Sequence, residues 1–263
     1  DHAHFIHVPT ATLTLSCLLE AGRYDELLAL LDQKKTRLWF DEKFGAEALL
    51  RQRRENEALA RAEALLLDQR RQWGHVEIAQ FCERILVSQG REEEAYLRFG
   101  LPSASGNTYL AMWRDLVKRY PDLDARRILE DLIDTHGSKG KWFAAAKTAR
   151  FLDIALECAA HYDAAPATLI RAARDLKLKE PSFAMQVALQ AIRHLVEGRG
   201  YEPSPLDIDE AVEHLMVAAT RLGEMDQARQ ALRRIAGSAL SAGLMAERLA
   251  RNIAALEAAD SDG

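Results

Sequence analysis

The chain has few of the residues that build covalent or metal-centred frameworks. Its 263 residues include three cysteines, Cys17, Cys82 and Cys158, which lie far apart and form no CxxC pair. This pattern excludes a recognisable zinc knuckle or disulfide framework. We expect each cysteine to be a small, buried, apolar residue.

Long apolar runs are also missing. No run approaches the roughly 18–20 residues that span a bilayer, and no charged-then-apolar leader opens the chain. The sequence therefore predicts no membrane contact and a cytoplasmic location. It begins without methionine, in "DHAHFIH", so we expect that an upstream segment precedes it. With 48% hydrophobic and 29% charged residues, the composition is typical of a folded soluble protein.

Motifs that carry chemistry are absent. The sequence has no nucleophile elbow, no dinucleotide fingerprint and no P-loop, because "GSKGKW" at 137–142 lacks both the P-loop spacing and a preceding strand. We predict no enzyme and no cofactor, with a site assembled from scattered residues as the remaining alternative. His2, His4 and His7 could supply three metal ligands only in a suitably curled backbone, so we predict no metal there but a frayed end. Glu210 and His214, four residues apart, predict a simple surface pair.

What the sequence does contain is helical periodicity. Apolar residues recur at helical spacing almost throughout, and no alternating strand pattern stands out. Prolines and glycines separate segments of a length that suits globular helices. Residues 46–71 fit one longer helix or two short ones, with the polar "RQRRENE" at 51–57 as an exposed turn. The sequence predicts an all-α protein.

Four junctions between these segments align without gaps. They read "EAGRYDELLALL", "SQGREEEAYLRF", "TARFLDIALECA" and "RLGEMDQARQAL", aligned on Gly22, Gly90, Arg150 and Gly223, at intervals of 68, 60 and 73 residues. The third residue after each junction residue is acidic, and the fifth is small or apolar (Leu27, Ala95, Ala155 and Ala228). We interpret each junction as a helix end, a tight turn, an acid at the start of the next helix, and a close helix contact. The intervals are about twice a 34-residue hairpin period.

The aligned segments resemble the turn and second helix of tetratricopeptide repeats, as in Gly22, Tyr24 and Leu27. The first-helix tryptophan and the closing proline of that pattern are not regularly in place. The resemblance implies an α-solenoid of antiparallel helical hairpins, with an N-terminal segment (1–100) continuous with a C-terminal one (101–263). A second resemblance covers residues 95–202, including "TYLAMWRDLVKRYP" and "GKWFAAAKTARFLDIALECA". This stretch is similar to an uncharacterised bacterial all-helical domain family with no assigned activity.

Charge is unevenly distributed. The net charge is −3 over residues 1–100, +3 over 101–200 and −5 over 201–263. The middle third holds two basic rows. One contains Lys139, Lys141, Lys147 and Arg150, and the other contains Arg171, Arg174 and Lys177. The simplest interpretation of each row is a solvated helix face.

The alternative is a binding patch. If 138–149 and 167–178 are helices of successive hairpins, their polar faces line one surface; in the competing arrangement they face opposite sides. The candidate binding residues are Lys139, Lys141, Trp142, Arg171 and Arg174, with a partly buried Trp142 as an apolar floor. Such a patch suits an acidic peptide segment or a phosphate.

From these patterns we predict a non-enzymatic helical-repeat scaffold that binds a protein or peptide partner, an acidic one at the patch. The alternative is nucleic-acid or phosphate-ligand binding through the basic middle third, although no strongly basic stripe is present.

Overall fold

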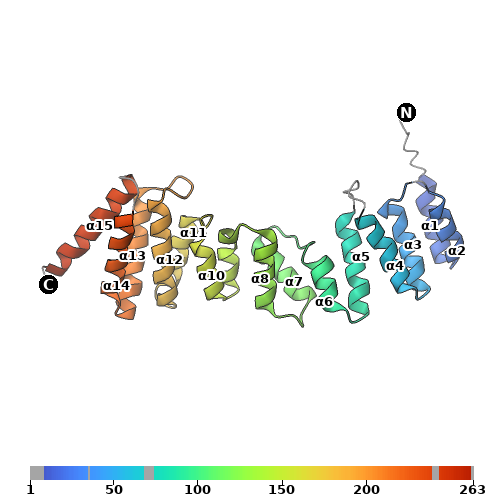
Figure 1. Cartoon of the computed structure of the whole chain (residues 1–263), viewed down its shortest axis with the longest axis horizontal. Helices are drawn as coiled ribbons and strands as arrows, with labels where there is room; N and C mark the ends of the chain where they lie inside the picture. Colours follow the sequence, from blue (N-terminus) through green and yellow to red (C-terminus); the bar gives the residue numbers. More distant parts are fainter. Residues whose placement is uncertain (1–8, 35, 68–73, 239–242, 262–263) are drawn as a thin grey trace, which may run out of the picture. The chain divides into compact units, whose positions relative to one another are not determined.

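The computed structural model describes residues 9–34, 36–67, 74–238 and 243–261. Within these ranges it contains fifteen α-helices and no strand (Figure 1), which confirms the all-α prediction. None of the helices in these ranges is long and apolar enough to cross a bilayer. Contacts divide the chain into two compact units, Asp1–Ser105 and Gly106–Gly263, which are described in turn.

Unit 1 is a series of helices that each pack on the next along the chain. The helices are α1 (Pro9–Glu20), α2 (Tyr24–Asp32), α3 (Trp39–Arg51), α4 (Glu55–Leu66), α5 (His75–Ser88), α6 (Glu92–Ala95) and the π-helical η1 (Tyr96–Gly100). A buried core cluster joins α1, α2 and α3 through Leu15, Leu18, Leu19, Leu27, Leu31 and Ala48. The segment 46–71 thus contains two helices, with "RQRRENE" spanning the turn between them.

Unit 2 contains the remaining elements. They are α7 (Tyr109–Arg119), α8 (Ala125–His136), the 3-10 turn η2 (Lys139–Trp142), α9 (Phe143–Thr148), α10 (Leu152–Ala160), α11 (Pro166–Leu176), α12 (Pro181–Val196), α13 (Pro205–Leu222), α14 (Met225–Ser238) and α15 (Leu244–Ser261). Proline opens α11, α12 and α13, where its missing N–H costs no helical hydrogen bond. Some helices pack mainly on their neighbours in the chain, as α12 does on α11 and α13, whereas α15 packs more extensively on α13 than on α14.

In the described residues, the same short backbone turn joins the two helices of five pairs. The junction residues are Gly22, Arg53, Gly90, Arg150 and Gly223, with left-handed φ values of 71°, 62°, 71°, 70° and 73°. In every turn the next residue donates its N–H to the carbonyl five residues earlier, at 2.8–3.1 Å, as in Arg23 to Leu18. This bond ends the first helix in a Schellman motif. The alignment of segments within this sequence identified four of these turns. It did not include the turn at Arg53, which lies between Gly22 and Gly90.

The residue five positions after each junction residue is buried. Leu27, Ala58, Ala95, Ala155 and Ala228 all have no exposed surface. Their N–H groups donate to the first residue after the junction, at 3.0–3.1 Å, and so form the first turn of the second helix. The small side chains expected at helix contacts are therefore in the core.

Side chains connect the three turns of unit 1 to one another. The turns at Arg53 and Gly90 each contain an arginine that donates to a glutamine of the same turn. That glutamine in turn donates to a side chain at the start of the second helix of the preceding hairpin. The bonds are Arg54 Nη1 to Gln52 Oε1 (2.9 Å), Gln52 Nε2 to Asp25 Oδ1 (3.3 Å), Arg91 Nη1 to Gln89 Oε1 (3.0 Å) and Gln89 Nε2 to Asn56 Oδ1 (3.3 Å). We call this series the turn ladder. It shows that the turns at Gly22, Arg53 and Gly90 lie side by side.

One cysteine departs from expectation. Cys82 and Cys158 are buried, and burial raises the pKa of their thiols to about 12 and about 11. Cys17 is exposed instead, because α1 turns Leu15, Leu18 and Leu19 toward the core and leaves Cys17 beside the exposed Leu13.

Candidate functional site

The five predicted binding residues lie in two elements of unit 2. Lys139, Lys141 and Trp142 belong to η2, and Arg171 and Arg174 belong to α11. The prediction of a single helix over 138–149 is wrong, because a 3-10 turn precedes α9. Ser138 has a left-handed φ of 49°, and the Lys141 N–H bonds back only three residues to the Ser138 carbonyl, at 2.9 Å.

Gly140 brings η2 against the segment that leads into α11. A Cβ at Gly140 would lie 2.2 Å from the Ala164 backbone nitrogen, so only glycine allows this approach. The Gly140 N–H donates to Asp163 Oδ1 at 2.8 Å. The two predicted elements are therefore linked through residues 161–165.

Two histidines hold this linking segment. His161 Nδ1 lies 2.5 Å from Asp163 Oδ1. Burial alone would raise the pKa of Asp163, but the bonds from His161 and the Gly140 N–H outweigh burial and lower it. On the other side, His194 of α12 is 1% exposed and donates from Nδ1 to the Ala164 carbonyl at 3.2 Å. Burial lowers the pKa of His194, which favours the neutral imidazole.

Trp142 does not form the expected apolar floor. Its side chain is fully buried, with the ring of Tyr109 at a centroid distance of 4.6 Å. Lys139 and Lys141 remain exposed beside it, and Lys139 lies 3.4 Å from Asp134. Trp142 is therefore a core residue of unit 2 and is removed from the candidate set.

Arg171 and Arg174 are exposed, and both bond within α11. Arg171 donates from Nε to the Ala167 carbonyl at 3.1 Å and from Nη2 to Thr168 Oγ1 at 3.2 Å. Arg174 donates from Nε to Asp175 Oδ1 at 3.0 Å. Side chains held so loosely on the surface keep most of their donors open to water or to an anionic partner.

Lys177, the third member of this row, contacts α13 instead. Its Nζ lies 3.1 Å from His214 Nδ1 and 3.5 Å from Glu213 Oε1, while His214 Nε2 lies 3.3 Å from Glu210 Oε1. Because an ammonium group only donates, Nδ1 of His214 accepts and Nε2 carries the proton toward Glu210. His214 is 4% exposed, so the predicted surface pair is half buried. The four-residue spacing indicated the contact between Glu210 and His214. It did not indicate that Lys177, which follows α11, contacts the histidine.

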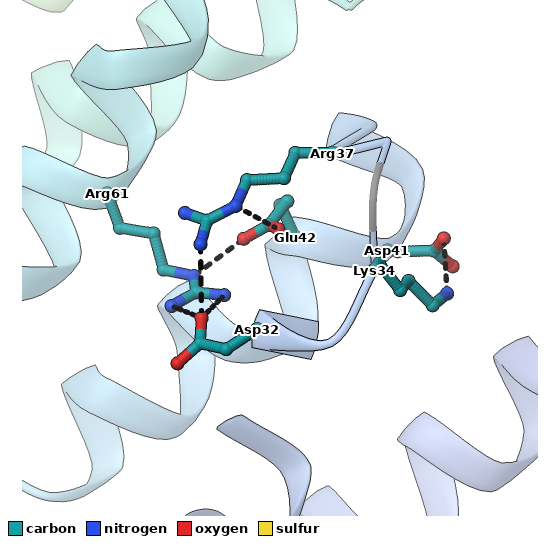
Figure 2. Close-up of polar contacts among 6 residues, drawn as sticks. All are labelled: Asp32, Lys34, Arg37, Asp41, Glu42 and Arg61. Carbon is teal, nitrogen blue, oxygen red and sulfur yellow. Dashed lines mark hydrogen bonds and ion pairs between the residues drawn. The ribbon is translucent and has the colours of Figure 1, made fainter. Parts of the chain in front are cut away.

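Unit 1 contains a cluster that the sequence did not reveal (Figure 2). Asp32 ends α2, Arg37 lies in the connection to α3, Glu42 belongs to α3 and Arg61 to α4. Arg61 donates to Glu42 Oε2 at 2.6 Å and, from both terminal nitrogens, to Asp32 Oδ1 at 3.2 Å. Arg37 lies 3.3 Å from Asp32 Oδ1 and 3.9 Å from Glu42 Oε1. We call these four residues the guanidinium–carboxylate cluster.

Glycine makes room for this cluster too. A Cβ at Gly45 would lie 3.1 Å from Arg61 Nε and 2.6 Å from Leu31 Cδ1. The available sequence signal was Glu42 itself, an acid on the α3 stripe that continues with the buried Ala46 and Leu49. An acid on an apolar stripe needs a cationic partner from another element, and the sequence did not show that Arg61 supplies it.

The three histidines for which we predicted no metal, His2, His4 and His7, lie outside the described residues. Where side chains are described, no group of three or more metal-ligating residues gathers.

No family model matches the chain, and neither a curated protein nor a solved structure matches it. The resemblances to tetratricopeptide repeats and, over residues 95–202, to the bacterial helical family therefore stay predictions.

Proposed function

We propose that this chain is a non-enzymatic scaffold that binds a protein or peptide partner on a surface built from successive helical hairpins. The hairpins of each unit are proposed to stack in the manner of a tetratricopeptide-like solenoid. The observation that carries the proposal is the turn ladder, together with the common backbone geometry of the five junctions.

The ladder supports stacking because it places equivalent turns of consecutive hairpins side by side. Hairpins in this arrangement present equivalent helix faces in a row, which gives an extended surface rather than a closed pocket. Side chains that repeat along such a surface suit an extended or helical ligand.

In unit 2 the proposed contact surface is the exposed face of α11. Among the residues that the structure describes, Arg171 and Arg174 bond to their own helix alone, and Lys139 and Lys141 are exposed across the linking segment. The proposed ligand is an acidic segment, whose carboxylates can replace Asp175 and the Thr168 hydroxyl as acceptors for the two guanidinium groups.

The proposal is tested with the double variant R171E/R174E. The full chain is immobilised, extract of its native cells is passed over it after nuclease treatment, and bound proteins are quantified. We expect the double variant to keep its helical circular dichroism and to lose most of the bound protein. The matched control R193E/R234E changes two exposed arginines of α12 and α14 by the same charge and should retain binding.

Two results would contradict this assignment. Unchanged capture by a folded R171E/R174E chain would remove α11 from the binding surface. Capture that disappears with nuclease and falls steeply with salt would favour the nucleic-acid alternative, since phosphate contacts release counterions.

A further inference from the structure

The guanidinium–carboxylate cluster of unit 1 contains two arginines held in very different ways. Arg61 is 13% exposed and makes close contacts with both carboxylates (Figure 2). Arg37 is 46% exposed; its 3.3 Å contact with Asp32 Oδ1 matches the 3.2 Å contacts of Arg61, but it lies 3.9 Å from Glu42 Oε1. Toward Glu42, therefore, Arg61 has the geometry of a structural ion pair and Arg37 does not.

Glu42 is left with one unsatisfied oxygen. Its side chain is 1% exposed; Oε2 accepts from Arg61, whereas Oε1 is buried and accepts no hydrogen bond from the residues that the structure describes. A buried carboxylate oxygen without a donor is unfavourable, because it has lost water and gained nothing equivalent. Arg37 Nε, at 3.9 Å, is too distant to donate to it.

The net charge of the cluster indicates which kind of group would satisfy Glu42 Oε1. Without Arg37, the cluster consists of Asp32, Glu42 and Arg61, with one negative charge in excess. Asp32 Oδ1 and Glu42 Oε1 both face the Arg37 guanidinium in Figure 2, so one planar cation can bridge them. A guanidinium group, with several donors in a plane, fits two carboxylates better than a compact ammonium does.

We propose that Asp32 and Glu42 form a receptor for a guanidinium group of a binding partner, an arginine side chain in a peptide or protein. In the free chain Arg37 occupies this receptor as an internal competitor. Its position on the α2–α3 connection and its half-exposed side chain let it leave without opening the core. This site is in unit 1 and is independent of the α11 surface proposed above.

With an internal competitor, the apparent affinity of the receptor equals its intrinsic affinity multiplied by the fraction of molecules in which the competitor is displaced. Removing it should therefore tighten binding, whereas removing a structural arginine would only weaken the fold. This difference in sign separates the two explanations.

The test uses the full chain and N-acetyl-L-arginine amide as the probe, titrated by calorimetry or NMR at constant ionic strength. We expect R37A to bind the probe about tenfold or more tightly than the wild type, with the lysine analogue binding more weakly. R37Q, which keeps more of the side-chain volume, should behave like R37A and serves if R37A folds poorly.

The matched control is R23A. Arg23 is also exposed and donates from Nε to Glu26 Oε1 at 2.7 Å, so its removal frees a surface carboxylate without a buried oxygen. R23A should leave probe binding at the wild-type level. The second-site variant R37A/D32N should lose the gained affinity, and Asp32 is exposed enough (56%) to be changed without opening the core.

Failure of both R37A and R37Q to bind more tightly overturns the proposal. So does a gain in affinity that survives D32N or that appears equally in R23A, because the probe would then be responding to general surface charge.

Discussion

At the scale of single residues, three largely buried polar side chains join separate elements of the fold. His194 holds residue 164 from α12, Asp163 holds η2, and Arg61 of α4 reaches the last residue of α2. Each of these contacts joins elements that share no helical hydrogen bond. These contacts hold the segment 161–165 between η2 and α12, and they join α4 to the end of α2.

His194 gives this role a measurable pH dependence. The pKa of the buried imidazole lies below its ordinary value of about 6.5, so between these two values the unfolded chain binds more protons than the folded one. The contribution of neutral His194 to the stability of the fold is complete above the ordinary pKa. It is lost as the pH falls from there through the lowered pKa. H194N keeps a donor near the Ala164 carbonyl but does not titrate.

We expect the free energy of unfolding of the wild type, measured by urea denaturation, to fall between pH 7.5 and pH 5. The same measurement on H194N should show a smaller fall. The control H136N changes an exposed histidine of the same unit and should keep the wild-type loss. Identical pH profiles for wild type and H194N would show that His194 is not the group responsible.

At the scale of elements, the five junctions show that the turn requires a left-handed backbone conformation but does not require glycine. Gly22, Gly90 and Gly223 meet the left-handed requirement without steric cost, and Arg53 and Arg150 meet it with a Cβ. Burial of the fifth residue and the Schellman bond overcome that cost. The turn is therefore specified by its surroundings as well as by glycine.

R53G tests this balance. Arg53 is exposed with a φ of 62°, so glycine should relieve backbone strain and stabilise unit 1 by about 1 kcal/mol. The opposite change, G22A, places a Cβ in open space at a φ of 71° and should destabilise by a similar amount. Both are measured by urea denaturation; destabilisation by R53G would mean that the Arg53 side chain contributes contacts that outweigh its strain.

These junctions also show how far sequence reasoning reaches. Helical periodicity was sufficient for the all-α fold, and an acid followed by a small or apolar residue located four turns, three of them with glycine at the junction. The turn at Arg53 was missed because Asn56 stands in place of the acid, whereas the turn at Arg150 has Asp153. Its signal was the arginine and glutamate found one and four residues after each junction residue of unit 1, in "GRYDE", "RRENE" and "GREEE". The burial of Trp142 and the union of Asp32, Glu42 and Arg61 depend on packing between elements, which local patterns do not contain.

At the scale of the whole molecule, the chain consists of two units with separate contact networks. Each has its own buried residues, such as Leu27 and Leu31 in unit 1 and Leu129 and Leu169 in unit 2. A unit with its own core can fold without the other.

We therefore expect fragments 1–105 and 106–263 each to show helical circular dichroism and a cooperative thermal transition. Proteolysis of the full chain under native conditions provides a second measurement, with the first cut expected near residue 105. A fragment that stays unfolded alone but becomes helical when mixed with the other would show that the two units share one folding reaction.

The turn ladder also determines where unit 1 can accept extra length. An insertion at Gln52 would move its side-chain amide away from Asp25, and an insertion at Gln89 would move that amide away from Asn56. Either insertion would separate two neighbouring hairpins. The connections between hairpins leave from the other ends of the helices, where the ladder has no bonds. A peptide tag or a reporter domain inserted after Gln33 or Leu67 would therefore be tolerated, whereas the same insertion at the ladder would divide the unit.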